Sequence, residues 1–445
     1  MTAQVASIAG LAVMFIIATV LPINMGALAF VGAFVIGLIS RMPAKDIFAG
    51  FPGDLFVTLV GITYLFAIAQ NNGTIDWLVH RAVWLVRGRI AAIPWVMFSV
   101  AAVLTGVGAV SPAAVAIIAP IALRFAQKYD INPLLMGLLV IHGAQAGGFS
   151  PMSIYGGITN QVVERAGLPR NDIALFLASL VFNFAVAVAL YVFFGGHRAA
   201  RRIADADQRA AADSPGTGVR SSDPDSPTAA LQGKAAEAAE LETRHSRLNS
   251  HRALTLMGLI TLGVGSLGFE LNVGLVAISV AVVLALLAPK AQKGAVDQVS
   301  WSTVLLITGV ITYVAVLQRV GAVDLVGTSV SGIGAPLVGA LLLCYIGGGV
   351  SAFASSVAVL GATIPLAVPF LLQGHVHAIG VVAAIAVSST IVDVSPFSTN
   401  GALVVANAQG LDKDRFYRQM LGYSALVVVV GPLLAWLVLI LPGWL

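Results

Sequence analysis

The chain of 445 residues is 58% hydrophobic, has only 10% Asp, Glu, Lys and Arg, and has a mean hydropathy of +0.94. A soluble domain carries roughly a quarter charged residues, so this composition excludes a soluble enzyme, a nucleic-acid-binding protein and a disordered chain. The charges are also clustered, because residues 197–252 contain 9 of the 24 basic and 8 of the 20 acidic residues. We therefore expect an all-α polytopic membrane protein with one hydrophilic interruption.

Apolar runs long enough to cross the hydrocarbon core, about 20 residues each, begin near the N-terminus. The first run, Val5 to Leu21, has no basic residue before it, which favours a retained span over a cleaved signal. The predicted simple spans lie near residues 4–21, 24–40, 54–71, 171–194, 253–269, 272–288, 301–318 and 416–441.

Four further apolar segments are interrupted by Gly, Ser and Pro and do not fit a simple crossing. Residues 90–126 and 335–372 are too long for one span, so each is predicted to form a re-entrant hairpin. Residues 133–163 and 376–408 are predicted to be discontinuous spans. Unwound backbone survives in a bilayer only where it is buried in protein or lines a cavity. We therefore expect ligand-binding groups at these interruptions.

Three domains are predicted: a first transmembrane repeat, 1–196, a hydrophilic linker, 197–252, and a second transmembrane repeat, 253–445. With about five crossings each, the repeats have opposite orientations. The face that collects most Lys and Arg is assigned to the cytoplasm. This places the linker in the cytoplasm and both termini outside the cell membrane. Residues 74–89 combine Trp and Leu with Arg and His, which predicts an amphipathic helix at the membrane surface.

Two motifs recur in the same order in both halves, which indicates an internal duplication. An odd number of crossings per copy makes the repeats inverted, and broken helices at matching places in inverted repeats are typical of secondary transporters. The motifs are Gln70-x-x-Gly73-x-Ile75-Asp76 with Gln318-x-x-Gly321-x-Val323-Asp324, shifted by 248, and Ser150-Pro151-x-Ser153-x-x-Gly156 with Ser395-Pro396-x-Ser398-x-x-Gly401, shifted by 245.

The broken segments offer uncharged donors for an anionic substrate. Helix N-termini at the hairpin tips direct free N–H groups and positive dipole ends inward, and hydroxyl groups add further donors. The simpler alternative for each serine is a hydrogen bond back to its own helix. The predicted substrate-binding residues are Ser111, Ser153, Ser355, Ser356, Ser398, Thr399 and Asn400.

Coupling to a cation is predicted at the few ionisable or carbonyl-rich positions at depth. Asp393 is a candidate because a carboxylate within a membrane is costly, with a structural hydrogen-bonding role as the alternative. His142 is either a proton-relay or substrate-binding residue or a helix–helix hydrogen-bonding group. Ser150 and Ser395 complete the predicted ion site. No cofactor is expected beyond a coupling Na⁺ or H⁺, and the single cysteine, Cys344, excludes a cysteine-based metal site.

The arrangement of hairpin, broken helix and duplication resembles the ion transporter superfamily, specifically the divalent anion/sodium symporter fold. The stretch Gly147-Gly148-Phe149-Ser150-Pro151 and the segment Asn24-Met25-Gly26-Ala27-Leu28-Ala29-Phe30 are most similar to the MatC group of dicarboxylate (malonate) carriers. The resemblance implies a homodimer and an elevator-like movement. It also implies a Ser-Asn-Thr motif at each hairpin tip, where this chain has Val110-Ser111-Pro112 and Ser355-Ser356-Val357.

The sequence therefore predicts a carrier of a small, malonate-like dicarboxylate, with the lipid bilayer as its environment and Na⁺ or H⁺ as its coupling ion. The alternative within transport is a cation/proton antiporter or an inorganic oxyanion carrier on the same scaffold. An intramembrane enzyme is not expected, because the chain has neither a His-Glu-x-x-His helix nor a second intramembrane Asp. A nucleic-acid partner is not expected either.

Overall fold

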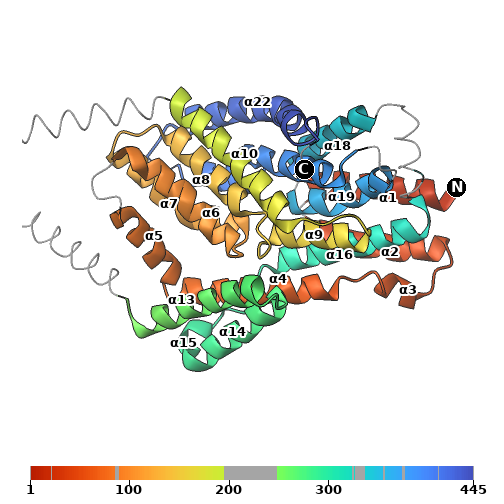
Figure 1. The fold of residues 1–445 in the computed structure, drawn as a ribbon, viewed down its shortest axis with the longest axis horizontal. Coiled ribbons are helices and arrows are strands. Elements are labelled where there is room, and N and C mark those ends of the chain that lie inside the picture. The colour runs from red at the N-terminus through yellow and green to blue at the C-terminus, as the bar shows by residue number, and fades with distance from the viewer. Residues whose placement is uncertain are drawn as a thin grey trace, which may run out of the picture.

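The computed structural model describes residues 2–21, 23–85, 90–194, 248–322, 325, 336–353, 356–372, 376–408 and 410–443. All regular secondary structure within these ranges is helical (Figure 1), as the composition predicts. Most of the linker, Ser355 and the end of the expected surface helix, 86–89, lie outside the described residues.

The first part of the chain follows the predicted series of simple spans, hairpin and broken helix. Its elements are α1 (Thr2–Val20), α2 (Met25–Ile39), α3 (Ala44–Phe48), α4 (Gly53–Asn71), α5 (Thr74–Leu85), η1 (Ile90–Ala92), α6 (Ile93–Gly106), α7 (Ser111–Lys128), α8 (Pro133–Gly147), α9 (Ile154–Arg165) and α10 (Asp172–Phe193).

The described residues of the second part have a similar order of long and short helices. Its elements are α13 (Ser250–Gly263), η2 (Val264–Gly268), α14 (Val273–Leu287), α15 (Pro289–Gln292), α16 (Trp301–Arg319), α18 (Pro336–Ser351), α19 (Ser356–Leu372), α20 (Ala378–Ile391), η3 (Val392–Val394), α21 (Thr399–Ala406) and α22 (Lys413–Leu439).

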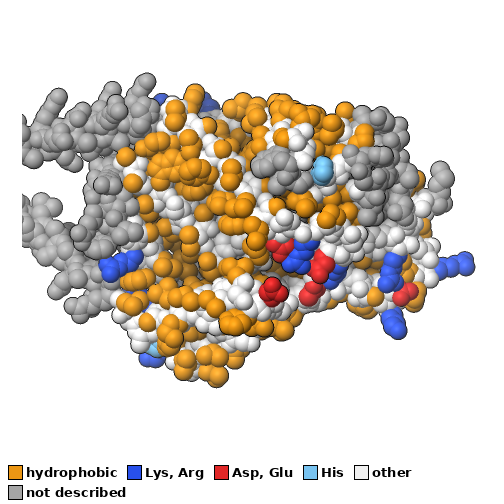
Figure 2. Space-filling model, viewed as in Figure 1, with side chains coloured by type: hydrophobic (Ala, Val, Ile, Leu, Met, Phe, Trp, Pro, Cys, Tyr) orange, Lys and Arg blue, Asp and Glu red, His pale blue; other side chains and the backbone are white. Residues whose placement is uncertain are grey.

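Several of these helices have the length and composition of membrane spans. Five are long and apolar enough to cross a bilayer, and the broken helix Ala378–Ala406 is one of them. Hydrophobic side chains are also spread across the described part of the face drawn in Figure 2. Large apolar residues such as Phe193 and Leu286 are 83% and 75% exposed, as expected for helices that face lipid. The protein is therefore a polytopic membrane protein.

The simple spans of the two parts cross each other at glycine contacts. A Cβ atom on Gly309 of α16 would lie 2.1 Å from the carbonyl oxygen of Gly26 in α2. At the second crossing, a Cβ atom on Gly61 of α4 would lie 2.8 Å from the carbonyl oxygen of Gly274 in α14. Helices approach this closely only through glycine, since any larger residue would force them apart. The crossings place α2 on α16 and α14 on α4, so each part of the chain packs on the other.

The hairpins and broken helices form a second group of helices. In this group, too, helices of the first part pack against helices of the second part. Hairpin helix α7 packs against α21, and α19 packs against α9. Within the first part, α6 lies directly on α8, because a Cβ atom on Gly143 would be 2.3 Å from the carbonyl oxygen of Phe98. The largest cluster of buried apolar residues runs through this group. This packing buries the interruptions of both broken helices.

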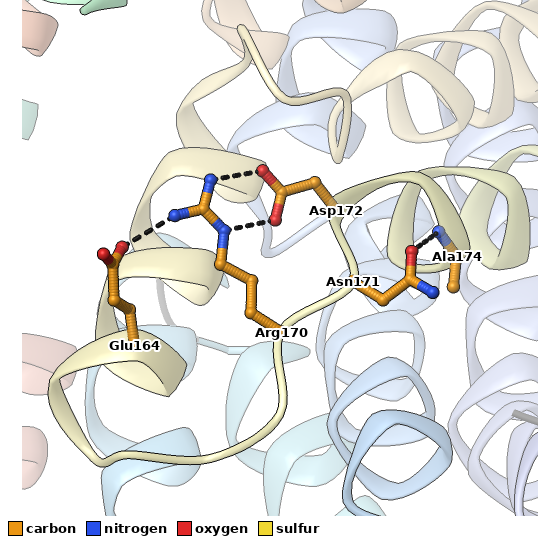
Figure 3. A network of polar contacts seen from close by, with 5 residues as sticks. All are labelled: Glu164, Arg170, Asn171, Asp172 and Ala174. Carbon is orange, nitrogen blue, oxygen red and sulfur yellow. Dashed lines mark hydrogen bonds and ion pairs between the residues drawn. The ribbon is translucent and has the colours of Figure 1, made fainter. Parts of the chain in front are cut away.

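Ion pairs fix the connection between α9 and α10 (Figure 3). The Arg170 guanidinium group donates to both carboxylate oxygens of Asp172, at 2.5 and 2.6 Å, and to Glu164 at 2.7 Å. The hydrogen bonds to Asp172, followed by the negative charges of both partners, raise the pKa of Arg170 above its ordinary value. The neighbouring Asn171 side chain caps α10 by accepting from the Ala174 N–H group.

Candidate substrate and ion site

The two Ser-Pro-x-Ser-x-x-Gly motifs form the same turn where the broken helices restart. Ser153 and Ser398 are the N-cap residues of α9 and α21, and their hydroxyl groups accept from the N–H groups of Gly156 and Gly401 at 3.3 Å. Each hydroxyl also donates to carbonyl groups of the unwound segment, including that of Ser150 or Ser395 three residues earlier. The serine hydroxyl groups of the motif therefore bond to backbone N–H and carbonyl groups at the point where the helix is interrupted.

The glycine that ends each motif allows the chain to fold back on itself. A Cβ atom on Gly156 would lie 2.1 Å from the carbonyl oxygen of Ser150, and one on Gly401 would lie 1.9 Å from that of Ser395. The first serine of the first motif also reaches the hairpin, because the Ser150 hydroxyl donates to the carbonyl oxygen of Gly106 at the end of α6. The first hairpin and the first broken helix are thus tied together at their interruptions.

Asp393 lies at the centre of the site, in the 3₁₀ turn η3 directly before the second motif. Its side chain is 5% exposed. One carboxylate oxygen, Oδ1, accepts from the Ser356 hydroxyl group at the start of α19. The other, Oδ2, accepts from Gln145 Nε2 of α8 at 2.9 Å and lies 3.4 Å from Asn400 Nδ2. A buried carboxylate with three donors is stabilised without any positive charge among these partners.

Asp393 and its partners Ser356, Gln145 and Asn400 form a polar cluster, the Asp393 cluster. Asn400 connects this cluster to the first hairpin. Its side-chain Nδ2 donates to the Ser111 hydroxyl group at 2.8 Å, although these residues are 289 positions apart. Ser111 and Ser356 are the first residues of α7 and α19, so both hairpin helices direct their positive ends at this cluster. Tyr155, a buried residue of α9, lies beside Ser111 and Asp393. The site thus combines groups from both hairpins and both broken helices.

Two buried oxygen atoms at the site have no hydrogen-bonding partner. They are Oε1 of Gln145 and Oδ1 of Asn400, the amide oxygens of the side chains that flank Asp393. An orphaned buried acceptor costs about 1–3 kcal/mol, and amide oxygens together with a carboxylate are ligands that a hard cation prefers. The donor N–H groups and helix ends suit an anion, while these oxygens suit a cation.

His142 lies one helical turn before Gln145 and is fully buried, but it does not contact Asp393. Its Nδ1 lies 3.0 Å from Asn183 Oδ1, and its Nε2 lies 2.9 Å from the Tyr423 hydroxyl group. Because Asn183 uses its Nδ2 to donate to the Ser179 carbonyl group, its oxygen faces His142, which assigns the proton to Nδ1. His142 therefore links α8 to α10 and α22.

The structure brings together Ser111, Ser356, Asn400 and Asp393 from the predicted site. Thr399 is exposed beside it, and Ser355 lies outside the described residues. Ser150, Ser153 and Ser398 direct their hydroxyl groups to backbone carbonyls, whereas the Ser395 hydroxyl accepts from the Phe397 N–H group. Gln145 and Tyr155 were not predicted; the signal for Gln145 was an amide in an otherwise apolar span, one turn after His142.

Comparisons with known proteins agree with the resemblance seen in the sequence. Residues 1–148 match the family model described as the N-terminus of the dicarboxylate carrier protein MatC. In structure, the chain is similar to the YdaH transporter of Alcanivorax borkumensis, with a TM-score of 0.57, 15% identity, and coverage of 88% of this chain and 86% of that chain. No curated protein matches the sequence. The resemblance to the MatC group is confirmed over the matched residues, and the fold is that of a known transporter.

Proposed function

We propose that this protein is a secondary active transporter that moves a small, malonate-like dicarboxylate across the cytoplasmic membrane together with Na⁺ or H⁺. The match to the dicarboxylate carrier family over residues 1–148 supports the substrate class. The observation that carries the proposal is the Asp393 cluster, in which one buried carboxylate, uncharged donors and two hairpin N-termini meet at the interruptions of both broken helices.

The described partners in this cluster carry no positive charge, so uncharged hydrogen-bond donors and helix ends hold the substrate carboxylates. The hydroxyls of Ser111 and Ser356, the Asn400 amide and the N-terminal ends of α7 and α19 supply hydrogen bonds and positive dipole ends. Ser153, Ser398 and Thr399 border the pocket from the restarting helices. A coupling cation then provides the positive charge that the protein lacks.

Asp393 is the proposed coupling residue. A proton would neutralise its carboxylate, whereas Na⁺ would be held by the carboxylate with the amide oxygens of Gln145 and Asn400, which have no partner here. The carbonyl groups freed at Ser150 and Ser395 border the same interruptions. Either cation lowers the cost of bringing an anion next to Asp393. His142, bonded through both ring nitrogens, supports this region from outside the cluster.

An inverted repeat is the proposed basis of this arrangement. The glycine crossings support it, because Gly26 and Gly61 are each 248 positions before their counterparts Gly274 and Gly309. The shared cap geometry of Ser153 and Ser398 supports it as well. With inverted repeats the linker lies in the cytoplasm and both termini lie outside. A homodimer, implied by the family resemblance, completes the proposal.

Uptake into proteoliposomes tests the function. The purified full-length chain should accumulate labelled malonate when a Na⁺ or a pH gradient is imposed separately, and unlabelled dicarboxylates should compete. Replacing Asp393 by Asn should remove the response to the driving gradient, while Asp297→Asn, at an exposed position, should not. If neither gradient drives uptake of malonate or succinate, the proposed function is wrong. Competition by an inorganic oxyanion alone would identify the alternative carrier type.

A further inference from the structure

The hydroxyl group of Ser356, at the start of α19, has a single proton to donate. Asp393 Oδ1 accepts this proton in a hydrogen bond. The hydroxyl group of Ser351 lies 2.8 Å from that of Ser356, and it must be the donor in this contact because the Ser356 proton is already in use. While Asp393 is bound, Ser356 therefore has no donor left for a substrate.

The side-chain amide of Asn400 is occupied in a similar way. An amide NH₂ group has two protons. In Asn400 it donates to the Ser111 hydroxyl oxygen at 2.8 Å and to Asp393 Oδ2 over a longer distance, 3.4 Å. Two of the residues that we propose for substrate binding, Ser356 and Asn400, thus donate to a side chain of the protein itself.

The group that accepts these hydrogen bonds is the same chemical group that a dicarboxylate carries at each end. The Asp393 carboxylate is buried and accepts from Ser356 in α19, from Asn400 in α21 and from Gln145 in α8. These three side chains are uncharged donors, and donors arranged around one carboxylate suit another carboxylate at the same place. We call these three donors the carboxylate subsite, and in this structure Asp393 fills it.

The first half of the chain has no carboxylate at the equivalent position. Ser111 and Ser356, the first residues of the two hairpin helices, are separated by 245 positions, the same shift as the two turn motifs. At this shift Asp393 corresponds to Gly148. A Cβ atom on Gly148 would lie 2.9 Å from Cδ2 of Tyr155, so the tyrosine ring takes up that space. A carboxylate that fills its own binding site is thus a feature of the second half.

We propose that Asp393 is a built-in competitor of the substrate: its carboxylate fills the carboxylate subsite until one carboxylate of the dicarboxylate takes its place. This inference rests on the proposed function, which supplies the dicarboxylate. Only molecules in which the subsite is empty can bind the substrate there, so the apparent affinity is lower than the intrinsic affinity. The competitor therefore prevents tight binding of the substrate until the coupling step has released Asp393.

Removal of the Asp393 carboxylate tests the subsite with a ligand other than the substrate. Asp393→Ala retains the Cβ atom and leaves the three donors without their acceptor, and formate has the size and charge of the missing group. Formamide is the uncharged probe of similar shape, and chloride at the same concentration controls for ionic strength. We expect formate alone to raise the unfolding midpoint of the full-length Asp393→Ala protein in detergent by at least about 2 °C. The parent protein should not respond.

Two control variants separate the subsite from general effects of the substitution. Thr390→Ala, also buried, removes a hydroxyl group that bonds to its own helix, and Asp297→Ala removes an exposed negative charge. Neither should respond to formate. Adding Ser356→Ala to Asp393→Ala removes one donor and should raise the formate concentration needed for half of the effect about tenfold. An Asp393→Ala protein that does not respond to formate would overturn the subsite.

Malonate binding tests the competition itself. Titration calorimetry in detergent, at one fixed pH and without Na⁺, gives the dissociation constants of the parent and the variants. We expect Asp393→Ala and Asp393→Asn to bind malonate at least about tenfold more tightly than the parent, because the subsite is then available in every molecule. Asp393→Asn preserves the shape of the side chain and provides this measurement if Asp393→Ala does not fold. Equal or weaker binding by these variants would overturn the competitor.

The two proposals fail in different ways. If formate stabilises Asp393→Ala but no dicarboxylate binds to any variant or is taken up by the parent, the proposed function is wrong, and with it the role of Asp393 as a competitor. If the parent accumulates malonate but the Asp393 variants bind it no more tightly, the competitor alone is overturned.

Discussion

Gln145 Nε2 donates a 2.9 Å hydrogen bond to Asp393 Oδ2, although the two residues are 248 positions apart. This contact joins α8, which ends at the first interruption, to η3, which precedes the second. Both side chains are buried. The bond therefore connects the two broken helices at the group that we propose for ion coupling.

Gln145→Met should weaken both stability and coupling. The thioether has a similar volume but cannot donate, so the Asp393 carboxylate loses a partner at a cost of about 1–3 kcal/mol. We expect a lower thermal unfolding midpoint in detergent and a changed dependence of uptake on the driving cation. Gln419→Met, at an exposed position, is the matched control. An unchanged cation dependence together with an unchanged midpoint would argue against a role for Gln145.

Alanine at the glycines of the turn motifs should disrupt the interruptions. The new Cβ atom would lie 2.1 Å from a carbonyl oxygen at Gly156 and 1.9 Å at Gly401, so the backbone would have to shift. We expect Gly156→Ala and Gly401→Ala each to lower the unfolding midpoint and to abolish uptake. In Gly157→Ala the nearest atom is 3.7 Å away, so this adjacent variant should behave like the parent. Equal effects at Gly156 and Gly157 would refute the turn geometry.

The helix crossing between α2 and α16 should be equally intolerant of larger residues. Gly309→Ala places a Cβ atom 2.1 Å from the Gly26 carbonyl oxygen and should separate the two helices. Gly422→Ala in α22, with no atom within 4 Å, is the control and should be neutral or slightly stabilising. Unfolding midpoints in detergent compare the two variants. A Gly309→Ala protein as stable as Gly422→Ala would contradict the observed crossing.

Tyr423→Phe should show how much the hydrogen bond between Tyr423 and His142 contributes to stability. Without the phenol group, Nε2 of the fully buried His142 has no donor, which costs about 1–3 kcal/mol. Tyr345→Phe removes a hydroxyl group that donates to the Val429 carbonyl group within α22, and this variant should be affected less. The measurement is the difference between the two unfolding midpoints. A difference of zero would show that the bond between α8 and α22 contributes little.

The Arg165–Asp54 ion pair should contribute little to stability. Its side chains are 42% and 48% exposed, and an exposed pair contributes only about 0.2–1 kcal/mol. We expect Arg165→Gln to leave the unfolding midpoint in detergent nearly unchanged, because water solvates both charges when the pair is broken. Lys45→Gln, at another exposed position, is the control. A midpoint clearly lower for Arg165→Gln than for Lys45→Gln would show that the pair contributes more than its exposure predicts.

Much of the architecture could be predicted because it depends on local chemistry. The interruptions at 148–153 and 395–398 lie within the segments expected to be discontinuous, since Gly, Ser and Pro disrupt a helix wherever they cluster. Ser153 and Ser398 are N-cap residues, and an N-cap depends only on residues within the same turn. The site could be predicted only in part. The sequence indicated Asp393 and Asn400 but not Gln145, whose role depends on contact with a residue 248 positions away.

Composition and local pattern by themselves determined that the chain is an all-helical membrane protein with paired helix breaks, because apolar runs and helix-breaking residues act within a few positions. Only the tertiary structure decided which polar groups meet. Asn400 reaches Ser111, Asp393 reaches Gln145, and His142 bonds instead to Asn183 and Tyr423. The tertiary structure also decided that α19 packs against α16, whereas a cleft lies between α7 and α4. Such pairings arise from helix packing between residues 41 to 289 positions apart, which no local pattern encodes.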